Sequence, residues 1–560
     1  MGDVYRRASR VVAWLGPAEN NSDKALDFLE YISSQIKFDW KTRTLSPPSG
    51  WSDFDARISN KDMEWNSDQL EPTTLIATRC LWEREWFYRV WIRQEIILAK
   101  AAILQVGHRK LKWQAFRSAI GCINCKPMSH GPKGPGFHSV YTVCEWFEAR
   151  PYSLDTLRWD LHDAQCRDPR DRIYGIMSLL HHDARALNIQ PNYLKLSVEV
   201  YRGVLLEWIA RHRTLEFLTA CELAGPEPVI IEGKRLPSWV PNWSILSSTS
   251  HRPPYLTHGT LVFQSDAYAL GLPGQDSRDT LKVTGVQCAT VSHVFEVEHQ
   301  LRRDFLSNVR HVWYEIREIL SGESLYPSEE SLFDAFCRSL MYGRFAESCT
   351  NSSVFSEVSW PPIHKPSLKF TVFRNLISSV VANTANSALD TSLLEDMHIE
   401  HRGRTPLVLS NGAIGSGLRS AQQGDIVCWL LGSQLPTVLR PVNTRPGKHY
   451  VVGPCYVDGI MAGEPLLGHL PEGFQFKILL DKHRKVSLVE QPEGLKLEYF
   501  PRKDPRLERL DVDLKAYNRA VKKGKRWQGT VYQAPGDSQT KPPEYNRSKP
   551  ETTADLALLF

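Results

Sequence analysis

Apolar residues recur with helical spacing at residues 22–36, "SDKALDFLEYISSQI". Positions three and four apart lie on one side of a helix, so the spacing predicts a helix with one buried face. Ser22 or Asp23 supplies a polar N-cap for its first turn. The run "VVAWL" at 11–15 is continuous and is stopped by Gly-Pro, which predicts a buried strand after a short N-terminal helix. The predicted helix face consists of Ala25, Leu26, Leu29, Ile32 and Ile36.

Further along the chain, helical apolar spacing and strand-like apolar runs occur again. Residues 89–100, "RVWIRQEIILAK", read as an amphipathic helix, and residues 101–107 read as a strand followed by a helix at 110–123. The segment 40–70 is polar and carries Pro and Gly, which predicts a loop. The segment 197–212 is expected to be a helix whose buried face carries Val198, Tyr201, Leu205, Trp208 and Ile209.

From about residue 230 the pattern changes to short β-like pieces, with helices again at 300–345 and 370–390. Residues 403–490 contain strand-like runs separated by turn residues, which predict a small antiparallel β unit with turns at Gly424–Asp425 and Gly432–Ser433. The earlier β-like pieces are "LPSWVPNWS" (236–244), "GTLVFQS" (259–265) and "DTLKVTGVQCATVSHVFEV" (279–297).

These patterns predict a mixed α/β chain. Its 560 residues exceed what one hydrophobic core supports. We expect five regions: a partial α/β domain at 1–128, a helical region at 140–225, a mixed α/β region at 226–400, a β-rich module at 401–495 and a basic tail without ordered structure at 496–560.

Composition narrows the class of protein. The chain is 42% hydrophobic and 23% charged, as in ordinary globular proteins, and its 17 Trp favour large packed cores or interfaces. No run reaches the roughly 20 apolar residues of a membrane span, and the first apolar run is too short for a signal peptide. We therefore expect an intracellular, cytoplasmic protein.

The cysteines give no sign of a disulfide framework, because there are 11 of them at scattered positions. Cys122 and Cys125 have the spacing of a zinc ligand pair, with His130, His138 and Cys144 downstream. A structural zinc site needs four ligands at defined spacing, so buried or surface thiols are favoured and no metal is expected.

The net charge of +5 comes from the tail. Residues 501–560 hold 13 Lys and Arg against 8 Asp and Glu. A solvated tail is favoured over one that binds nucleic acid or anionic lipid.

Five stretches, in order, carry a family resemblance. They are residues 4–17, 86–100, 168–180, 236–244 and 424–464. Together they resemble the fungal heterokaryon incompatibility (HET) domain proteins. The motif residues are Trp14, Gly16, Trp86, Gln94, Asp168, Arg170, Asp171, Trp239, Trp243, Gly424, Asp425 and Gly459.

The resemblance implies nonself recognition followed by programmed cell death, an immune-like response, in a TIR-like α/β fold with a parallel sheet. Several TIR proteins cleave NAD with a glutamate in a Trp-x-x-x-Glu pattern, which Trp91 and Glu95 match here. Residues four apart share a helix face, and an indole wall would desolvate the carboxyl and raise its pKa. Glu95 is thus the candidate catalytic residue, with Trp91 and Arg89 binding substrate. Alternatively, Glu95 pairs with a basic neighbour.

The other motif residues suggest structural roles. Asp168 is expected to cap a helix and to pair with Arg172, four residues on, although a catalytic role for Asp168 or Asp171 is the alternative. Trp239 and Trp243 are expected to be packing anchors. No nucleotide-binding glycine loop and no nucleophile elbow is present.

The sequence also departs from the family pattern. HET domains begin with two further strand elements, "SYVWG"-like and "IDxxCINQ"-like, so we expect an N-terminally incomplete domain here. On this interpretation the chain is an interaction or regulatory protein that acts with other proteins of an incompatibility pathway, or with itself. The alternative is a toxic effector that cleaves NAD as its substrate, and neither mechanism requires a cofactor.

Overall fold

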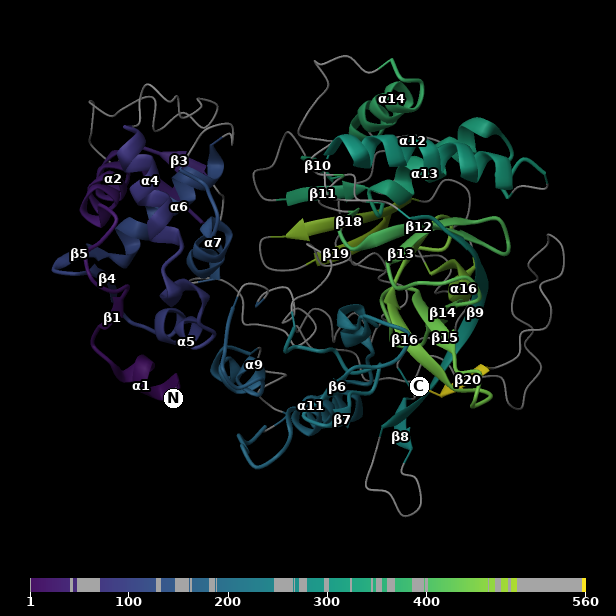
Figure 1. Ribbon diagram of the computed structural model, residues 1–560, viewed down its shortest axis with the longest axis horizontal. Helices are drawn as coiled ribbons and strands as arrows, with labels where there is room; N and C mark the ends of the chain where they lie inside the picture. The colour runs from purple at the N-terminus through teal and green to yellow at the C-terminus, as the bar shows by residue number, and fades with distance from the viewer. Residues whose placement is uncertain are drawn as a thin grey trace. The chain divides into compact units, whose positions relative to one another are not determined.

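The chain forms two compact units, residues 1–193 and 194–560. Each is described by itself, from a computed structural model (Figure 1). The described residues are 2–40, 44–47, 71–126, 132–146, 161, 164–180, 187, 189–245, 265, 267–270, 279–296, 302–322, 325–343, 346–348, 355–359, 368–384, 397, 401–461, 463–468, 475–481, 485–490 and 556–559.

Unit 1 contains a three-stranded sheet in the order β1-β4-β5, with β1 at Val11–Trp14, β4 at Ala102–Val106 and β5 at Arg109–Lys112. β1 runs parallel to β4, whereas β5 is antiparallel to β4. The predicted strands at 11–15 and 101–107 are therefore confirmed. Side chains of β1 alternate between buried and exposed, as a strand with one covered face requires.

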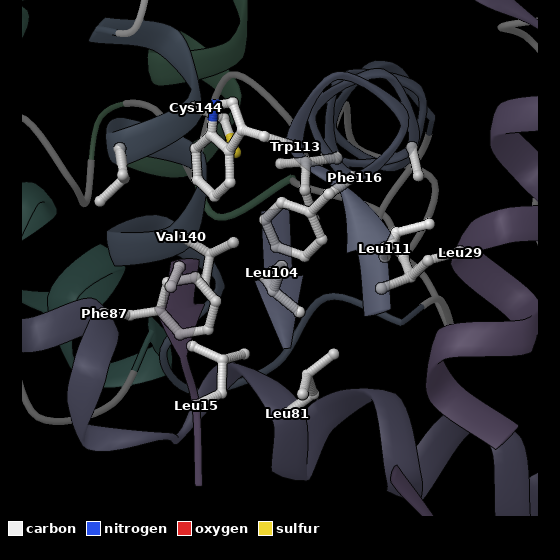
Figure 2. Packing of buried hydrophobic residues seen from close by; sticks show 14 of the residues in the cluster. Leu15, Leu29, Leu81, Phe87, Leu104, Leu111, Trp113, Phe116, Val140 and Cys144 are labelled. Carbon is white, nitrogen blue, oxygen red and sulfur yellow. The ribbon is translucent and has the colours of Figure 1, made fainter. Parts of the chain in front are cut away.

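Helices cover the buried face of this sheet. They are α2 (Ser22–Gln35), α4 (Pro72–Trp82), α6 (Trp113–Cys125) and α7 (Phe137–Trp146). Their apolar side chains and those of the strands form one core, in which Phe116 and Trp113 lie near Leu104 and Leu111 (Figure 2). The predicted face of α2 is buried as expected, but the cap is Asn21, in the left-handed region, rather than Ser22 or Asp23.

Shorter elements complete unit 1. They are α1 (Gly2–Arg7), the hairpin of β2 (Lys37–Asp39) and β3 (Thr44–Ser46), η1 (Glu85–Tyr88), α5 (Ile92–Ile97), α9 (Asp171–Tyr174) and η2 (Met177–Leu179). The helix predicted at 89–100 is shorter than expected. Arg89 is in extended conformation and bridges to Gln165, so the helix begins only at Ile92. The rest of the expected 40–70 loop lies outside the described residues.

Unit 2 is built around a nine-stranded sheet. Of the antiparallel strands expected within 403–490, those from 404 to 457 are confirmed in this sheet, whereas the later ones belong to a second sheet. The central strand of the nine-stranded sheet is β9 (Thr280–Val294), which pairs with β14 and with β12. The other strands are β8 (Tyr268–Leu270), β12 (Arg404–Leu409), β13 (Ile414–Leu418), β14 (Ile426–Leu430), β15 (Thr437–Pro441), β16 (His449–Pro454), β17 (Tyr456–Val457) and β20 (Leu556–Leu559).

Three helices of unit 2 pack together near β12 and β13, and they fall in the regions where helices were expected (Figure 1). They are α12 (Arg302–Ile319), α13 (Glu329–Leu340) and α14 (Leu368–Val381). Trp313, Phe336 and Phe373 belong to their shared core. The predicted helix at 197–212 is α11 (Ser197–His212), and its expected apolar face is buried.

Unit 2 also contains smaller elements. They are η3 (Glu216–Ala220), β6 (Ile230–Ile231), β7 (Lys234–Arg235), α16 (Glu464–Leu467), and a four-stranded sheet of β10 (Ala346–Ser348), β11 (Phe355–Ser359), β18 (Gln475–Asp481) and β19 (Lys485–Glu490).

One segment of unit 2 differs from the prediction, and others lie outside the described residues. The β-like segment at 236–244 forms turns, since Pro237 and Pro241 lack the N–H that a ladder needs. Of the segment 259–265, only Ser265 is described. Of the tail at 496–560, which was expected to lack ordered structure, only β20 is described, and it is a strand. The five-region division remains a prediction.

Candidate functional site

Glu95 lies on α5 and is half-buried. The polar side chains of Tyr5, on α1, and Trp86, on η1, lie close enough to its carboxyl to lower its pKa. α1 and α5 are in contact, which explains how a residue from the start of the chain reaches this carboxyl. The exposed Arg89 lies near enough to act on the same group electrostatically.

The environment of Glu95 raises the pKa of its carboxyl above the ordinary value. Burial is the largest cause, and the Arg89 guanidinium and the nearby Trp86 and Tyr5 side chains lower the pKa only in part. Burial and the neighbouring carboxylate in turn raise the pKa of Tyr5. The group is therefore a carboxyl able to exchange a proton closer to neutral pH than an exposed glutamate.

Trp91 directs its polar atom elsewhere. Its indole N–H donates to Asp171 Oδ2 at 3.1 Å, and the Tyr193 hydroxyl donates to Asp171 Oδ1 at 2.7 Å. The indole that acts on the pKa of Glu95 is that of Trp86. The Trp-x-x-x-Glu spacing thus places Trp91 at the start of α5, bonded to α9, while Trp86 is the tryptophan near the carboxyl.

Two polar residues of α5 are buried beside Glu95. Gln94 is 1% exposed, and its amide donates to the carbonyl oxygens of Tyr174 and Gly175. Arg93 is also 1% exposed, and within the described part of the chain its Nε and Nη1 have no hydrogen-bond partner. Gln94 therefore attaches α5 to the segment after α9.

Asp168 pairs with a different arginine from the one expected. Its carboxylate accepts from the backbone N–H of Arg170 at 3.0 Å and from the Arg170 guanidinium at 2.7 and 2.8 Å. These bonds hold the pKa of Asp168 below its ordinary value. The expected pair with Arg172 is not formed, and Arg172 donates to the Leu161 carbonyl at 2.6 Å. Nor does Asp168 cap α9, whose N-cap is Arg170.

The remaining N-terminal motif residues are structural in their contacts. Gly16 has φ of +109°, and its carbonyl accepts from Gly107 at 2.9 Å, which fixes the turn after β1. Trp86 is buried against Phe87 and Trp113. Trp14 is 49% exposed on β1.

The C-terminal motif residues lie in unit 2. Asp425 is 2% exposed and forms an ion pair with Arg440 at 2.9 Å. Gly424 and Gly459 have φ of +90° and +88°, which suits glycine in the turns that they form. None of these three residues belongs to the unit that carries Glu95.

The two motif tryptophans are also in unit 2. Trp239 is fully buried and donates to the Asp279 carbonyl at 2.9 Å, next to β9. Trp243 packs edge-on against Tyr201 of α11, with ring centroids 5.1 Å apart. Both side chains join the 236–244 segment to neighbouring elements of the same unit.

The cysteine pair that resembled zinc ligands lies at the end of α6. Burial raises the pKa of the Cys122 thiol to about 12, which disfavours the thiolate that a metal needs. Among the described residues, no group of three or more His, Cys, Asp or Glu side chains is arranged to hold a metal ion. His130 lies outside them.

Sequence reasoning missed Tyr5 at this site. A tyrosine in a six-residue N-terminal helix carries no local signal, because its contact with Glu95 joins positions 90 residues apart. Trp86 was named as a motif residue, but its effect on the pKa of Glu95 was not expected.

The comparisons with known proteins concern both units. A family model described as "Heterokaryon incompatibility protein (HET)" matches residues 1–95, and the "Het-6 beta-barrel domain" matches residues 382–477. The chain is 22% identical over 548 residues to "Heterokaryon incompatibility protein 6, OR allele" of Neurospora crassa, across 83% of this chain and 78% of that protein. The chain is thus similar to heterokaryon incompatibility proteins in two separate regions. The HET match includes α1, β1, α2, α4 and η1, and it ends within α5 at Glu95.

Two further comparisons concern solved structures and membrane-spanning helices. No solved structure is significantly similar to the chain. Within the described ranges, none of the helices combines the length and the hydropathy needed to cross a bilayer.

Proposed function

We propose that this protein acts in fungal heterokaryon incompatibility, in nonself recognition that leads to programmed cell death. The supporting observation is that a HET match and a Het-6 beta-barrel match occur in one chain, whose similarity to an incompatibility protein extends over 83% of its length. A likeness confined to one short domain would support a shared fold element more than a shared role.

We further propose that the protein works by binding other proteins of an incompatibility pathway rather than by catalysis. Tyr5 and Trp86 lie close enough to Glu95 to lower the pKa of its carboxyl, and Arg89 acts on it electrostatically, so these polar neighbours all come from unit 1. A carboxyl with internal partners of this kind is what a structural role requires.

The second candidate is a TIR-like enzyme that cleaves NAD. The observation in its favour is the raised pKa of Glu95, since perturbed carboxyls cluster at active sites. In this mechanism the carboxylate would stabilise the oxocarbenium-like transition state of N-glycosidic cleavage. The exposed Arg89 would attract the NAD phosphates.

Expression in a filamentous fungus tests both proposals. Wild type, Glu95→Gln and the control Glu85→Gln would be expressed at equal levels, with viability and cellular NAD measured after fusion with incompatible and compatible strains. Glu85 is an exposed glutamate of neighbouring η1, so it controls for the loss of one carboxylate. The binding mechanism predicts death in incompatible fusions for all three variants, without NAD loss before death.

The outcomes separate the candidates. NAD loss that Glu95→Gln abolishes and Glu85→Gln preserves would replace the binding mechanism by the enzymatic one. If neither expression nor deletion of the gene alters viability after any fusion, the incompatibility role itself is rejected.

A further inference from the structure

Arg93 of α5 carries a positive charge inside the core of unit 1. Its side chain is 1% exposed, and its Nε and Nη1 have no hydrogen-bond partner in the described part of the chain. Among the same residues its guanidinium forms no ion pair either. Arginine stays protonated in proteins, and a buried charge without a counter-charge destabilises the fold. A counter-charge is therefore expected at Arg93.

The acidic residue of α5 does not supply this counter-charge. Glu95 follows Arg93 by two positions, and residues two apart on a helix do not face each other. The guanidinium that acts on the Glu95 carboxyl is that of Arg89. The surroundings of Arg93 are thus distinct from the candidate site at Glu95.

A second buried guanidinium lies in the same part of the core. Arg93 and Arg117 both act electrostatically on the buried thiol of Cys144, on α7, which places both side chains near it. Arg117, on α6, is also 1% exposed. Its Nε donates to the Cys144 carbonyl at 2.6 Å, and its guanidinium lies 4.6 Å from the centroid of the Trp40 ring. The region around Cys144 therefore contains two guanidiniums.

The described part of unit 1 has no buried acidic residue to balance these arginines, because its buried charged side chains are all basic. Burial raises the pKa of the Cys144 thiol, so the thiol stays protonated and cannot serve as the anion. The buried basic residues are Arg84, Arg93, Arg117, Lys126 and Arg172.

We propose that Arg93, with Arg117 nearby, binds a small oxyanion of the size of phosphate inside unit 1, beside Cys144. The oxygens of phosphate match the planar donor array of a guanidinium. A carboxylate of another protein does not fit this position, because a guanidinium that is 1% exposed offers no surface to a partner chain. The anion supplies the counter-charge that Arg93 needs.

The bound anion stabilises the fold. The buried site exists only in the folded chain, so an anion that binds there shifts the equilibrium away from the unfolded chain. This inference is independent of the proposed role in incompatibility and of any reaction at Glu95.

Thermal unfolding of the full chain tests the site, with protein purified without phosphate or sulfate and measured in sodium phosphate and in sodium chloride of equal ionic strength. Saturating phosphate should raise the Tm of the wild type by about 2–4 °C or more. Arg93→Met removes the charge from a long side chain and should abolish this rise. Without phosphate, Arg93→Met should be at least as stable as the wild type, because it buries no charge at this position.

Arg84→Met is the matched control. Arg84 is also buried, but its guanidinium pairs with Glu19 at 2.7 Å. Its replacement should lower the Tm and preserve the rise with phosphate, because the counter-charge of Arg84 comes from the chain itself.

Three results would overturn the proposal. The first is a wild-type Tm that phosphate does not change. The second is a rise that persists in Arg93→Met, which would mean an adventitious ion only, bound elsewhere on the chain. The third is an Arg93→Met chain that, without phosphate, is destabilised as strongly as Arg84→Met or does not fold, because Arg93 would then have a counter-charge within the chain.

Discussion

The indole N–H of Trp91 donates to Asp171 across 80 positions of the chain, at 3.1 Å. This bond joins the first residue before α5 to the start of α9. The neighbouring Tyr193 hydroxyl bonds the same carboxylate, so Asp171 connects three segments of unit 1. The Trp91 indole N–H therefore has a structural role at Asp171 and does not act on the Glu95 carboxyl.

This separation predicts different effects for two tryptophan substitutions. Trp91→Phe should lower the free energy of unfolding by about 1 kcal/mol through loss of one hydrogen bond, without moving the pKa of Glu95. Trp86→Phe should raise the pKa of Glu95 further, because a donor to the charged form is lost. NMR titration of the glutamate side-chain carboxyl carbons measures both. An equal pKa change in the two variants would contradict the geometry.

The raised pKa of Glu95 predicts a pH-dependent stability. Between the unfolded-state pKa and the higher folded-state pKa, the folded chain holds a proton that the unfolded chain has released. This contribution is fully present below the unfolded pKa and is lost as pH rises through the folded one. Glu95→Gln cannot ionise, so wild type should lose stability relative to the variant over that window. Urea unfolding at several pH values measures the difference; a constant difference would refute the shift.

Unit 2 contains a buried ion pair that should be sensitive to substitution. Arg338 on α13 bonds Asp458 at 2.7 and 2.9 Å, with side chains only 12% and 10% exposed. The Tyr456 hydroxyl also donates to Asp458, at 2.9 Å. Asp458→Asn leaves a buried guanidinium without its counter-charge and should destabilise the protein by about 3–5 kcal/mol.

An exposed pair in the same unit provides the comparison. Arg235 and Glu227 are 2.6 Å apart, with side chains 53% and 61% exposed. Glu227→Gln should change stability by no more than about 1 kcal/mol, because water screens the exposed pair. Urea unfolding of both variants tests the contrast, and equal effects would show that burial does not decide the strength of the Arg338–Asp458 pair.

Substitution by alanine should change the stability of the protein in opposite directions at two glycines. Gly453 in β16 has φ of +152°, and a Cβ there would lie 2.3 Å from Leu418 Cδ1, so Gly453→Ala should cost roughly 1–3 kcal/mol. Gly203 lies inside α11 with nothing within 4 Å of a Cβ. Gly203→Ala should therefore stabilise the chain by about 0.5–1 kcal/mol. Thermal unfolding of both variants measures the signs; a destabilising Gly203→Ala would contradict the open space seen there.

Local periodicity was enough to predict the elements whose burial is set within a few residues. The face of α2, the strand β1 and the antiparallel strands after residue 403 follow from apolar spacing and turn residues alone. The predictions that were wrong concern side chains with more than one possible hydrogen-bond partner. Asp168 had two candidate arginines nearby in sequence, and it bonds Arg170, whereas Arg172 donates to the Leu161 carbonyl. Spacing alone does not rank such contacts.

Long-range pairing accounts for most of what the sequence did not reveal. Nothing in residues 279–297 indicates that β9 lies between β12 and β14. Similarly, Tyr5 gave no indication that it would meet Glu95, since helix α1 has no amphipathic pattern pointing to α5. The segment 236–244 looked β-like because of its tryptophans. Its backbone forms turns, because its prolines lack the N–H that a strand ladder needs.

The position of β9 affects how the protein is made. Its neighbours on the sheet pair Val294 with Leu407 and Gly285 with Leu430, more than 100 residues further along the chain. At about 5–20 residues per second, a ribosome needs several seconds or more to supply them. During that time Leu281, Val283 and Val291, buried in the finished sheet, have no strand from β12 or β14 to cover them. The growing chain therefore presents an unpaired, aggregation-prone strand for seconds during synthesis.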